Sequence, residues 1–315
     1  MRSTFLLLRT PADIYHAHDV SGLPACYIAA CLRRKPLVFE SHEMPLFERP
    51  LSELNSSRRF LRTILALLLK RIVPRCAGVI TVSPPIVEEI RRRYHVSRIA
   101  LLRNLPEYRE VPRNNRLREH LQLAASTRIV LYQGNIQPNR ELDRLIHAAS
   151  HFEPGIVLVI MGKDMKGTVS QLHSLIEQQG VAGQVKILPP VPYSELLTWT
   201  ASADLGVTIY SPDYSLNVSM FLPNKLFEYL LVGVPVLSSN IGPIVEVIQK
   251  YDVGQIIASL APEDIAAAIN LLLHDKEALQ RMRAHALTAS RDELCWEKES
   301  PRLLQLYAEI AHKEC

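Results

Sequence analysis

Short runs of aliphatic and β-branched residues alternate along this chain with longer segments of helical periodicity. The alternation is typical of βαβ units, in which helices cover the faces of a parallel sheet, and it predicts an α/β protein. The predicted strands are 12–17, 36–41, 78–82, 99–102, 129–133, 156–161, 185–188, 205–209, 234–237 and 255–258. The amphipathic stretch 297–312 is predicted to be a helix.

The strand pattern divides the chain into two Rossmann-like, doubly wound domains. Six runs in strict alternation predict a complete domain over 127–290, with a ligand crevice at the carboxyl ends of its strands. Four runs predict a partial domain over 1–110. The polar, proline-containing segment 111–126 is predicted to be the linker, and 291–315 a C-terminal helix that packs back toward the first domain.

Composition supports a folded cytoplasmic protein. The 315 residues are 48% hydrophobic and 22% charged, which is enough for two domains with real cores and excludes disorder. The apolar run 5–8 is too short for a signal peptide or a membrane span. The cysteines lack paired or metal-like spacing, which argues against a disulfide framework and fits a reducing cytosol. They are Cys26, Cys31, Cys76, Cys295 and Cys315.

The basic residues are concentrated in the first part of the chain. Residues 1–126 contain 21 Lys and Arg against 11 Asp and Glu, whereas the remainder contains 15 against 21. A basic half suits nucleic acid, an anionic lipid surface or a phosphorylated acceptor. Because no motif for reading bases accompanies the charge, we predict no nucleic-acid partner.

Part of this charge surrounds the apolar run 64–69. The flanking cations are Arg58, Arg59, Arg62, Lys70, Arg71 and Arg75. A basic amphipathic helix is expected at a membrane interface, and burial of its apolar run against the sheet is an equal alternative. The first alternative predicts a peripheral protein on the inner face of the membrane.

A glycine turn predicts an anion site in the second domain. Gly134 closes the first strand of this domain, and Arg140 follows in the turn that opens a helix. Free backbone N–H groups and a guanidinium then converge on one point, which suits a phosphate. The alternative is a glycine needed only for the turn, with a solvated arginine.

A more specific signal is the phrase Leu-Pro-Asn-Lys-Leu-Phe-Glu-Tyr-Leu at 222–230, followed by Gly-Val-Pro-Val at 233–236. It resembles the signature of glycosyltransferase family 4. These are retaining enzymes of the GT-B fold, which move a sugar from a nucleotide diphosphate to an acceptor. Further matching phrases are Tyr132-Gln133-Gly134, Met161-Gly162, Ala203-Asp204, Cys295-Trp296-Glu297, His16-Ala17-His18-Asp19, Ser41-His42-Glu43 and Thr81-Val82-Ser83.

The resemblance assigns roles to residues in both halves. Glu228 matches the glutamate that holds the donor ribose, Arg140 the cation that grips the diphosphate, and Lys225 a second cation beside it. The implied donor-binding set is Gly134, Asn135, Arg140, Gly162, Val191, Met220, Phe221, Leu222, Lys225 and Glu228. His42 matches a catalytic histidine near the diphosphate and sugar, and the acceptor-side residues are His18, Asp19 and Glu43.

Two positions depart from the family pattern. Met220 stands where the family usually has a glutamate that contacts the transferred sugar, and Asn135 where many members carry a basic residue. Backbone N–H groups over 217–221 are expected to substitute.

No metal or other cofactor is predicted, because a DxD-like motif is missing where the donor would need one. His16 and His18 share one face of a strand and, with Asp19, raise the alternative of a metal site. We disfavour it because a fourth ligand is missing and the resemblance explains the phrase without metal.

Complete family members have three further βα units before the strand at 12–17, so this strand is predicted to be an unpaired edge. A start codon assigned too late, a separate subunit that supplies the missing part, and a decayed inactive gene are the alternatives. The resemblance implies a metal-independent retaining glycosyltransferase with a nucleotide-sugar donor in the interdomain cleft. A lipid-linked or glycan-precursor acceptor is among the candidates.

Three other functions stay open: a partner-dependent nucleotide-sugar-binding subunit, an inactive relic, and a nucleotide-sugar epimerase. An epimerase would need carboxylates in the cleft, for which Glu40 and Glu43 are the candidates. The donor base, the sugar and the acceptor are not predicted.

Overall fold

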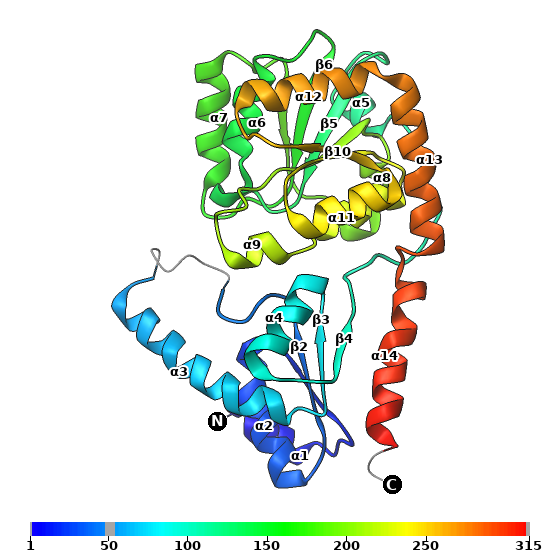
Figure 1. Cartoon of the computed structure of the whole chain (residues 1–315). Helices are drawn as coiled ribbons and strands as arrows, with labels where there is room; N and C mark the ends of the chain where they lie inside the picture. The colour runs from blue at the N-terminus through cyan, green and yellow to red at the C-terminus, as the bar shows by residue number, and fades with distance from the viewer. Residues whose placement is uncertain (1, 48–53, 313–315) are drawn as a thin grey trace. The chain divides into compact units, whose positions relative to one another are not determined.

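The structure of the protein is a computed structural model that describes residues 2–47 and 54–312 (Figure 1). Cys315 lies outside the described residues. The chain forms two compact units. Unit 1 takes 1–104, 213–222 and 299–315, and unit 2 takes 105–212 and 223–298. All ten predicted strands are present, with ends that differ from the predicted ones by three residues or fewer.

Unit 1 contains a parallel four-stranded sheet in the order β1-β2-β3-β4. Its strands are β1 (Tyr15–His18), β2 (Leu37–Ser41), β3 (Gly78–Thr81) and β4 (Ile99–Leu101). The helices of this part are α1 (Arg2–Arg9), α2 (Asp19–Arg33), α3 (Ser56–Ile72), α4 (Pro84–Tyr94), α9 (Leu216–Met220) and, from residue 299 on, α14 (Trp296–Ala311). Within the described residues β1 pairs only with β2, so it forms an edge of the sheet, as predicted.

The two faces of this sheet are covered by different helices. Successive side chains of a strand point to opposite faces. Leu37 and Phe39 of β2 therefore pack in one core with residues of α2, α3 and α4. Val38, on the other face, packs with Leu306 and Ile310 of α14. We call this second surface the α14 face.

Unit 2 contains a parallel six-stranded sheet in the order β10-β9-β8-β5-β6-β7. Its strands are β5 (Arg128–Gln133), β6 (Ile156–Met161), β7 (Val185–Leu188), β8 (Leu205–Thr208), β9 (Val236–Ser239) and β10 (Gly254–Ile257). The helices are α5 (Arg116–His120), α6 (Leu142–Ala149), α7 (Thr168–Gln179), α8 (Tyr193–Thr200), α10 (Asn224–Leu231), α11 (Gly242–Tyr251), α12 (Pro262–His274) and α13 (Lys276–Asp292). The strand order reverses between β5 and β8, which is the switch point where doubly wound sheets bind ligands.

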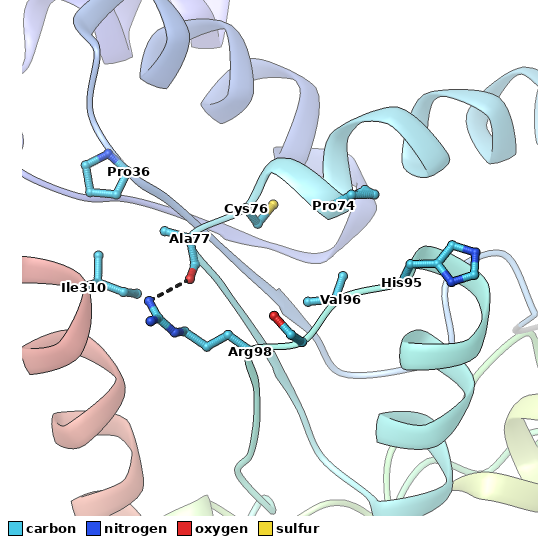
Figure 2. A pocket seen from close by; sticks show the side chains of 9 residues that line it. Pro36, Pro74, Cys76, Ala77, His95, Val96, Arg98 and Ile310 are labelled. Atoms are coloured by element: carbon cyan, nitrogen blue, oxygen red, sulfur yellow. Dashed lines mark hydrogen bonds between the residues drawn. The ribbon is translucent and has the colours of Figure 1, made fainter. Parts of the chain in front are cut away.

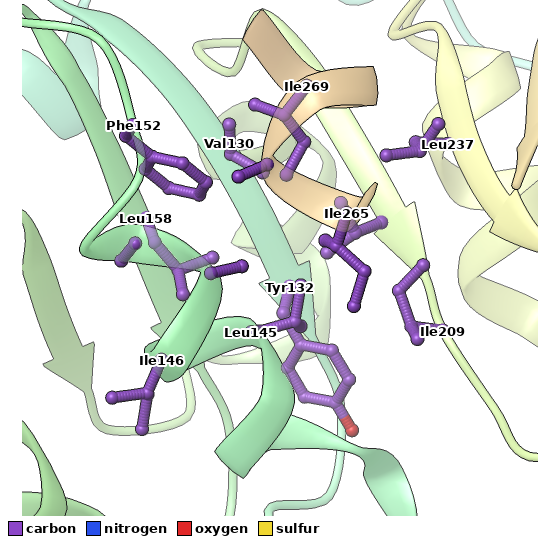
Figure 3. Close-up of a cluster of buried hydrophobic side chains, with 14 of the residues drawn as sticks. Val130, Tyr132, Leu145, Ile146, Phe152, Leu158, Ile209, Leu237, Ile265 and Ile269 are labelled. Carbon is purple, nitrogen blue, oxygen red and sulfur yellow. The ribbon is translucent and has the colours of Figure 1, made fainter. Parts of the chain in front are cut away.

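The core of unit 2 is made by its sheet and the helices over one face of it. Figure 3 shows Val130 and Tyr132 of β5 packed among Leu145 of α6 and Ile265 and Ile269 of α12. These side chains are buried, and strands covered on both faces consist of nearly continuous apolar runs, as β5 and β6 do.

The segment predicted to be a linker, 111–126, packs into unit 2. It contains α5, whose Arg118 is 5% exposed. The Arg118 guanidinium donates to the carbonyl oxygens of Thr127 at 2.9 Å and Ser202 at 2.8 Å, and it forms an ion pair with buried Asp204. The Arg118 side chain thus provides hydrogen-bond partners for buried groups of unit 2, and this part of the predicted linker is packed against that unit.

Candidate functional site

Two glycines meet at the carboxyl ends of β5 and β6. Gly134 follows β5 with φ near 129°, and its N–H donates to the carbonyl of Met161 at 3.0 Å. A Cβ added to Gly162 would lie 1.7 Å from the Gly134 carbonyl oxygen. Only glycine at position 162 allows this close approach of the two backbones.

A buried lysine lies beside this turn. Lys225, in the first turn of α10, is 8% exposed, and its Nζ is 3.6 Å from the centroid of the Tyr132 ring. A Cβ on Gly134 would be only 3.4 Å from the same Nζ. Among the described residues this nitrogen has no hydrogen-bond partner. A buried lysine nitrogen without a partner is expected to favour binding of an anion, which stabilises its protonated form.

Arg140 adds a second cation to the same place. Its guanidinium carbon is 5.2 Å from the centroid of the Tyr210 ring, and Nζ of Lys225 is 5.6 Å from that ring. Burial, followed by repulsion from Arg140, holds the pKa of Lys225 well below its ordinary value, whereas Glu228 acts in the opposite direction. An anion between the two cations would relieve this repulsion.

Glu228 is positioned by a network that starts on β5. The Gln133 side-chain amide donates to Oε2 of Glu228 at 2.6 Å, and its oxygen accepts from the Thr200 hydroxyl at 2.7 Å. The Tyr229 hydroxyl donates to the Leu131 carbonyl at 2.9 Å and accepts the Gln133 N–H at 3.1 Å, which fixes the end of the strand. Glu228 is 8% exposed, and burial raises the pKa of its carboxyl.

The other predicted donor residues are distributed over both units. Asn135 is exposed, and its carbonyl accepts from the Tyr132 hydroxyl at 2.8 Å. Val191 is half-buried before α8. Tyr193, an exposed residue of α8, was not predicted from the sequence. Partial desolvation, followed by the charge of Glu228, raises the pKa of its hydroxyl. Tyr193 comes near Glu228 only because α8 packs against α10, and no local sequence pattern indicates that packing.

Met220, Phe221 and Leu222 belong to the segment that clusters with unit 1. The carbonyl of Met220 accepts from the Ser83 hydroxyl at 2.6 Å, and its side chain packs on the unit 1 core. The structure thus brings Gly134, Arg140, Gly162, Lys225 and Glu228 together in unit 2 and keeps these three residues with the other unit.

The predicted histidine and its neighbours lie at the carboxyl ends of β1 and β2. His42 Nε2 is 3.1 Å from Oε1 of Glu40, and the His42 backbone N–H donates to Asp19 at 3.2 Å. The hydrogen bond to Glu40 raises the pKa of His42, against the effect of burial. His18 is exposed with Nδ1 3.4 Å from Glu40, and Glu43 is exposed.

A pocket of about 370 Å³ lies elsewhere on unit 1 (Figure 2). Pro36, Ala77 and Arg98 stand just before β2, β3 and β4, so the pocket is at the amino end of the sheet. Arg98 donates to the Ala77 carbonyl at 3.3 Å across it. Doubly wound sheets bind ligands at the opposite, carboxyl end, so we assign no site to this pocket.

Two sequence profiles match this chain. The family described as "Glycosyl transferases group 1" matches residues 114–288, and the one described as "Glycosyltransferase Family 4" matches residues 1–105. The first match covers more than half of the chain, and the protein therefore belongs to the glycosyl transferases group 1 family.

Curated relatives are similar over most of the chain. A D-inositol 3-phosphate glycosyltransferase of Streptomyces bingchenggensis is 25% identical over 313 residues, which cover 94% of this chain and 66% of the relative. The enzyme of the same name from Nocardia farcinica is 29% identical over 199 residues, covering 61% and 42%. The chain thus spans less than two thirds of the length of these relatives.

Solved structures show the same fold. Anabaena Alr3699/HepE in complex with UDP and glucose superposes with a TM-score of 0.80 at 17% identity, covering 98% of this chain and 80% of that one. Sucrose-phosphate synthase of Thermosynechococcus elongatus gives 0.75 at 17% identity, covering 96% and 74%. The predicted fold class, two Rossmann-like parallel-sheet domains of GT-B type, is confirmed.

The close approach of the two glycines predicts a severe effect of Gly162→Ala. The added methyl must displace the Gly134 carbonyl, and such overpacking costs about 1–3 kcal/mol. We expect unit 2 to unfold at a lower urea concentration than in the wild type. The unfolding is measured by the fluorescence of Trp199 and Trp296, the only tryptophans of the chain. Gly183→Ala is the matched control, because a Cβ there meets nothing within 4 Å. Equal midpoints for the two variants would contradict the prediction.

Proposed function

We propose that this protein is a glycosyltransferase that takes its sugar from a nucleotide diphosphate sugar. The observation that carries the proposal is the buried, unpartnered Lys225 side chain beside the glycine turn and Arg140. A diphosphate would supply a negatively charged partner for both basic side chains. Membership of the family and the similarity to the Anabaena protein in complex with UDP and glucose support the same chemistry.

The two cations would stabilise the departing nucleotide diphosphate. Charge builds up on the leaving phosphate as the bond to the sugar breaks, and fixed cations in a site with little water stabilise that charge strongly. Lys225 and Arg140 supply this without a metal ion, so we propose metal-independent transfer. Retention is proposed on the family resemblance, with the leaving phosphate assisting the acceptor.

Glu228 would hold the ribose of the donor. Among the described residues Gln133 is the only hydrogen-bond donor to its carboxylate, which leaves acceptor capacity for two hydroxyl groups. Two such charge-assisted bonds would fix the nucleoside relative to Lys225, one turn earlier on α10.

Titration calorimetry with UDP, GDP and ADP tests the donor site. We expect saturable binding of one nucleotide, weakened about 10- to 100-fold by Glu228→Ala, since hydrogen bonds to a charged group contribute about 1.5–3 kcal/mol. Glu177→Ala, an exposed glutamate of α7, is the control and should bind like the wild type.

Absence of binding to a folded chain would refute the proposal. Binding without consumption of any nucleotide-sugar would instead favour the partner-dependent subunit. Met220, which stands where the family carries a glutamate and packs on unit 1, is the observation that favours this second function.

Proton uptake provides an independent test of Lys225. Its pKa is lowered in the free protein, and a bound diphosphate should raise it, so binding should take up protons in mildly alkaline buffer. The measurement is UDP binding enthalpy in buffers of different ionisation enthalpy. Proton uptake should be lost in Lys225→Met. It should be kept in Lys276→Met, the control, which replaces an exposed lysine at the start of α13. Proton release by the wild type would contradict the assignment.

We further propose that α3 lies on an anionic membrane surface. Of its residues only Leu69 and Ile72 are buried, and the helix contains no acidic residue. Its large apolar side chains are exposed by 40–70%: Phe60, Leu61, Ile64, Leu67 and Leu68. Within the described residues no helix has both the length and the apolar character needed to cross a bilayer, so contact at the interface is proposed.

Vesicle co-sedimentation tests this surface. We expect binding to phosphatidylglycerol vesicles that is weaker at high salt and absent with phosphatidylcholine alone. Phe60→Ser with Leu67→Ser should weaken binding at least tenfold, because burying such side chains contributes about 1.5–3 kcal/mol each. Leu271→Ser, whose side chain is 66% exposed on α12, is the control. An equal loss in the control would refute a role for α3.

A further inference from the structure

Three metal-ligating side chains share the α14 face of the unit 1 sheet. His16 and His18 alternate with Tyr15 and Ala17 along β1, and the latter two pack in the core on the opposite face. The register pairs His18 with Glu40 of β2. Because alternation is the same on both strands, His16, His18 and Glu40 are forced onto one surface at the carboxyl ends of β1 and β2.

The ligand atoms of these three residues lie close together. Nε2 of His16 is 2.9 Å and Nδ1 of His18 is 3.4 Å from Oε2 of Glu40, and all three ligand atoms are within 4.8 Å of one another. In a tetrahedral zinc site with Zn–N bonds of about 2.0–2.1 Å, neighbouring ligand atoms are about 3.3 Å apart. The observed separations therefore need only small side-chain rotations to surround one ion.

Tyr307, a residue outside this group of three, fixes the orientation of His16. The Tyr307 oxygen, on α14, is 2.5 Å from Nδ1 of His16. Metal-ligating histidines almost always donate their other ring N–H to an oxygen, which leaves the first nitrogen free for the ion. Tyr307 can accept from Nδ1–H in this way and direct Nε2 toward Glu40. The His16 and His18 rings stack at 4.4 Å, so both rings approach the site in parallel.

We propose that His16, His18 and Glu40 bind one divalent transition-metal ion of the zinc type. Two imidazoles and one carboxylate suit zinc and its neighbours, whereas magnesium prefers oxygen ligands. The third ligand is Glu40, from the next strand, and not Asp19, which instead accepts the backbone N–H of His42. The exposed side of His18 leaves a position open to a water molecule or a hydroxyl group of a ligand. This inference does not rest on the proposed function.

The alternative is a cluster held by hydrogen bonds alone. Glu40 also lies 3.1 Å from Nε2 of His42, so one carboxylate contacts three imidazoles. In this alternative the Glu40 oxygens accept hydrogen bonds from the imidazoles and need no metal ion to satisfy them. The two interpretations therefore differ in whether the chain binds zinc at neutral pH.

The test is calorimetric titration of the untagged full chain, freed of metal by a chelator, with Zn²⁺ and with Mg²⁺. We expect one Zn²⁺ per chain at micromolar concentration, no response to Mg²⁺, and a visible absorption band with Co²⁺. His18→Ala and Glu40→Gln should each weaken binding far more than tenfold. Tyr307→Phe, which removes the outer oxygen, should weaken it about 10- to 100-fold.

His274→Ala is the matched control, because this exposed histidine pairs with the single carboxylate of Glu153. It should bind Zn²⁺ like the wild type. Circular dichroism verifies that each variant is folded, and UDP titration of His18→Ala shows whether the donor site is intact. Failure of the folded wild type to bind at millimolar Zn²⁺ would overturn the proposal. Binding by His18→Ala or Glu40→Gln that equals binding by the wild type would also overturn it.

Discussion

Parallel strands all have their carboxyl ends on the same side of the sheet, and this constraint determines where polar groups gather in both units. Most side chains before that end are buried between helices, so the groups that can turn toward a ligand lie mainly in the last residues of a strand or directly after it. In unit 2 these are Gln133 and Gly134 after β5 and Gly162 after β6. In unit 1 they are His18 and His42, near the ends of β1 and β2. The two cores hold these edges in place.

Two opposite charges of the proposed donor site, Lys225 and Glu228, are kept apart although they are on one helix. Lys225 and Glu228 are three residues apart on α10 and hence on neighbouring positions of its surface. Glu228 bonds to Gln133, and the Lys225 amine lies over the Tyr132 ring. If the two formed a buried ion pair, a ligand would have to break it, at a cost of several kcal/mol. Their separate partners leave both groups available to a ligand, as the proposed donor site requires.

The strands and the motif at 222–230 could be recognised in the sequence because each is a pattern of neighbouring residues. Runs such as 156–161 need no distant partner to be recognised, and Lys225 and Glu228 stand in one short motif. The Thr200–Gln133–Glu228 network was not predictable, because it joins three elements that only tertiary packing brings together. The same reason hid Arg118, whose ion pair with Asp204 turns a polar segment into part of unit 2. Glu40 was visible as a carboxylate, but its register against β1 was not.

The alternation along β1 makes the length of this strand a constraint in its own right. His16 and His18 face α14, while Tyr15 and Ala17 fill the core on the other face. A single residue inserted or deleted inside the strand would exchange the two sets, placing two imidazoles in an apolar core and an aromatic ring among charged groups. Residues added in the turn before Tyr15 would leave the strand unchanged. Length variation among descendants of this chain should therefore be confined to the turn, and the four strand positions should be inherited as a block.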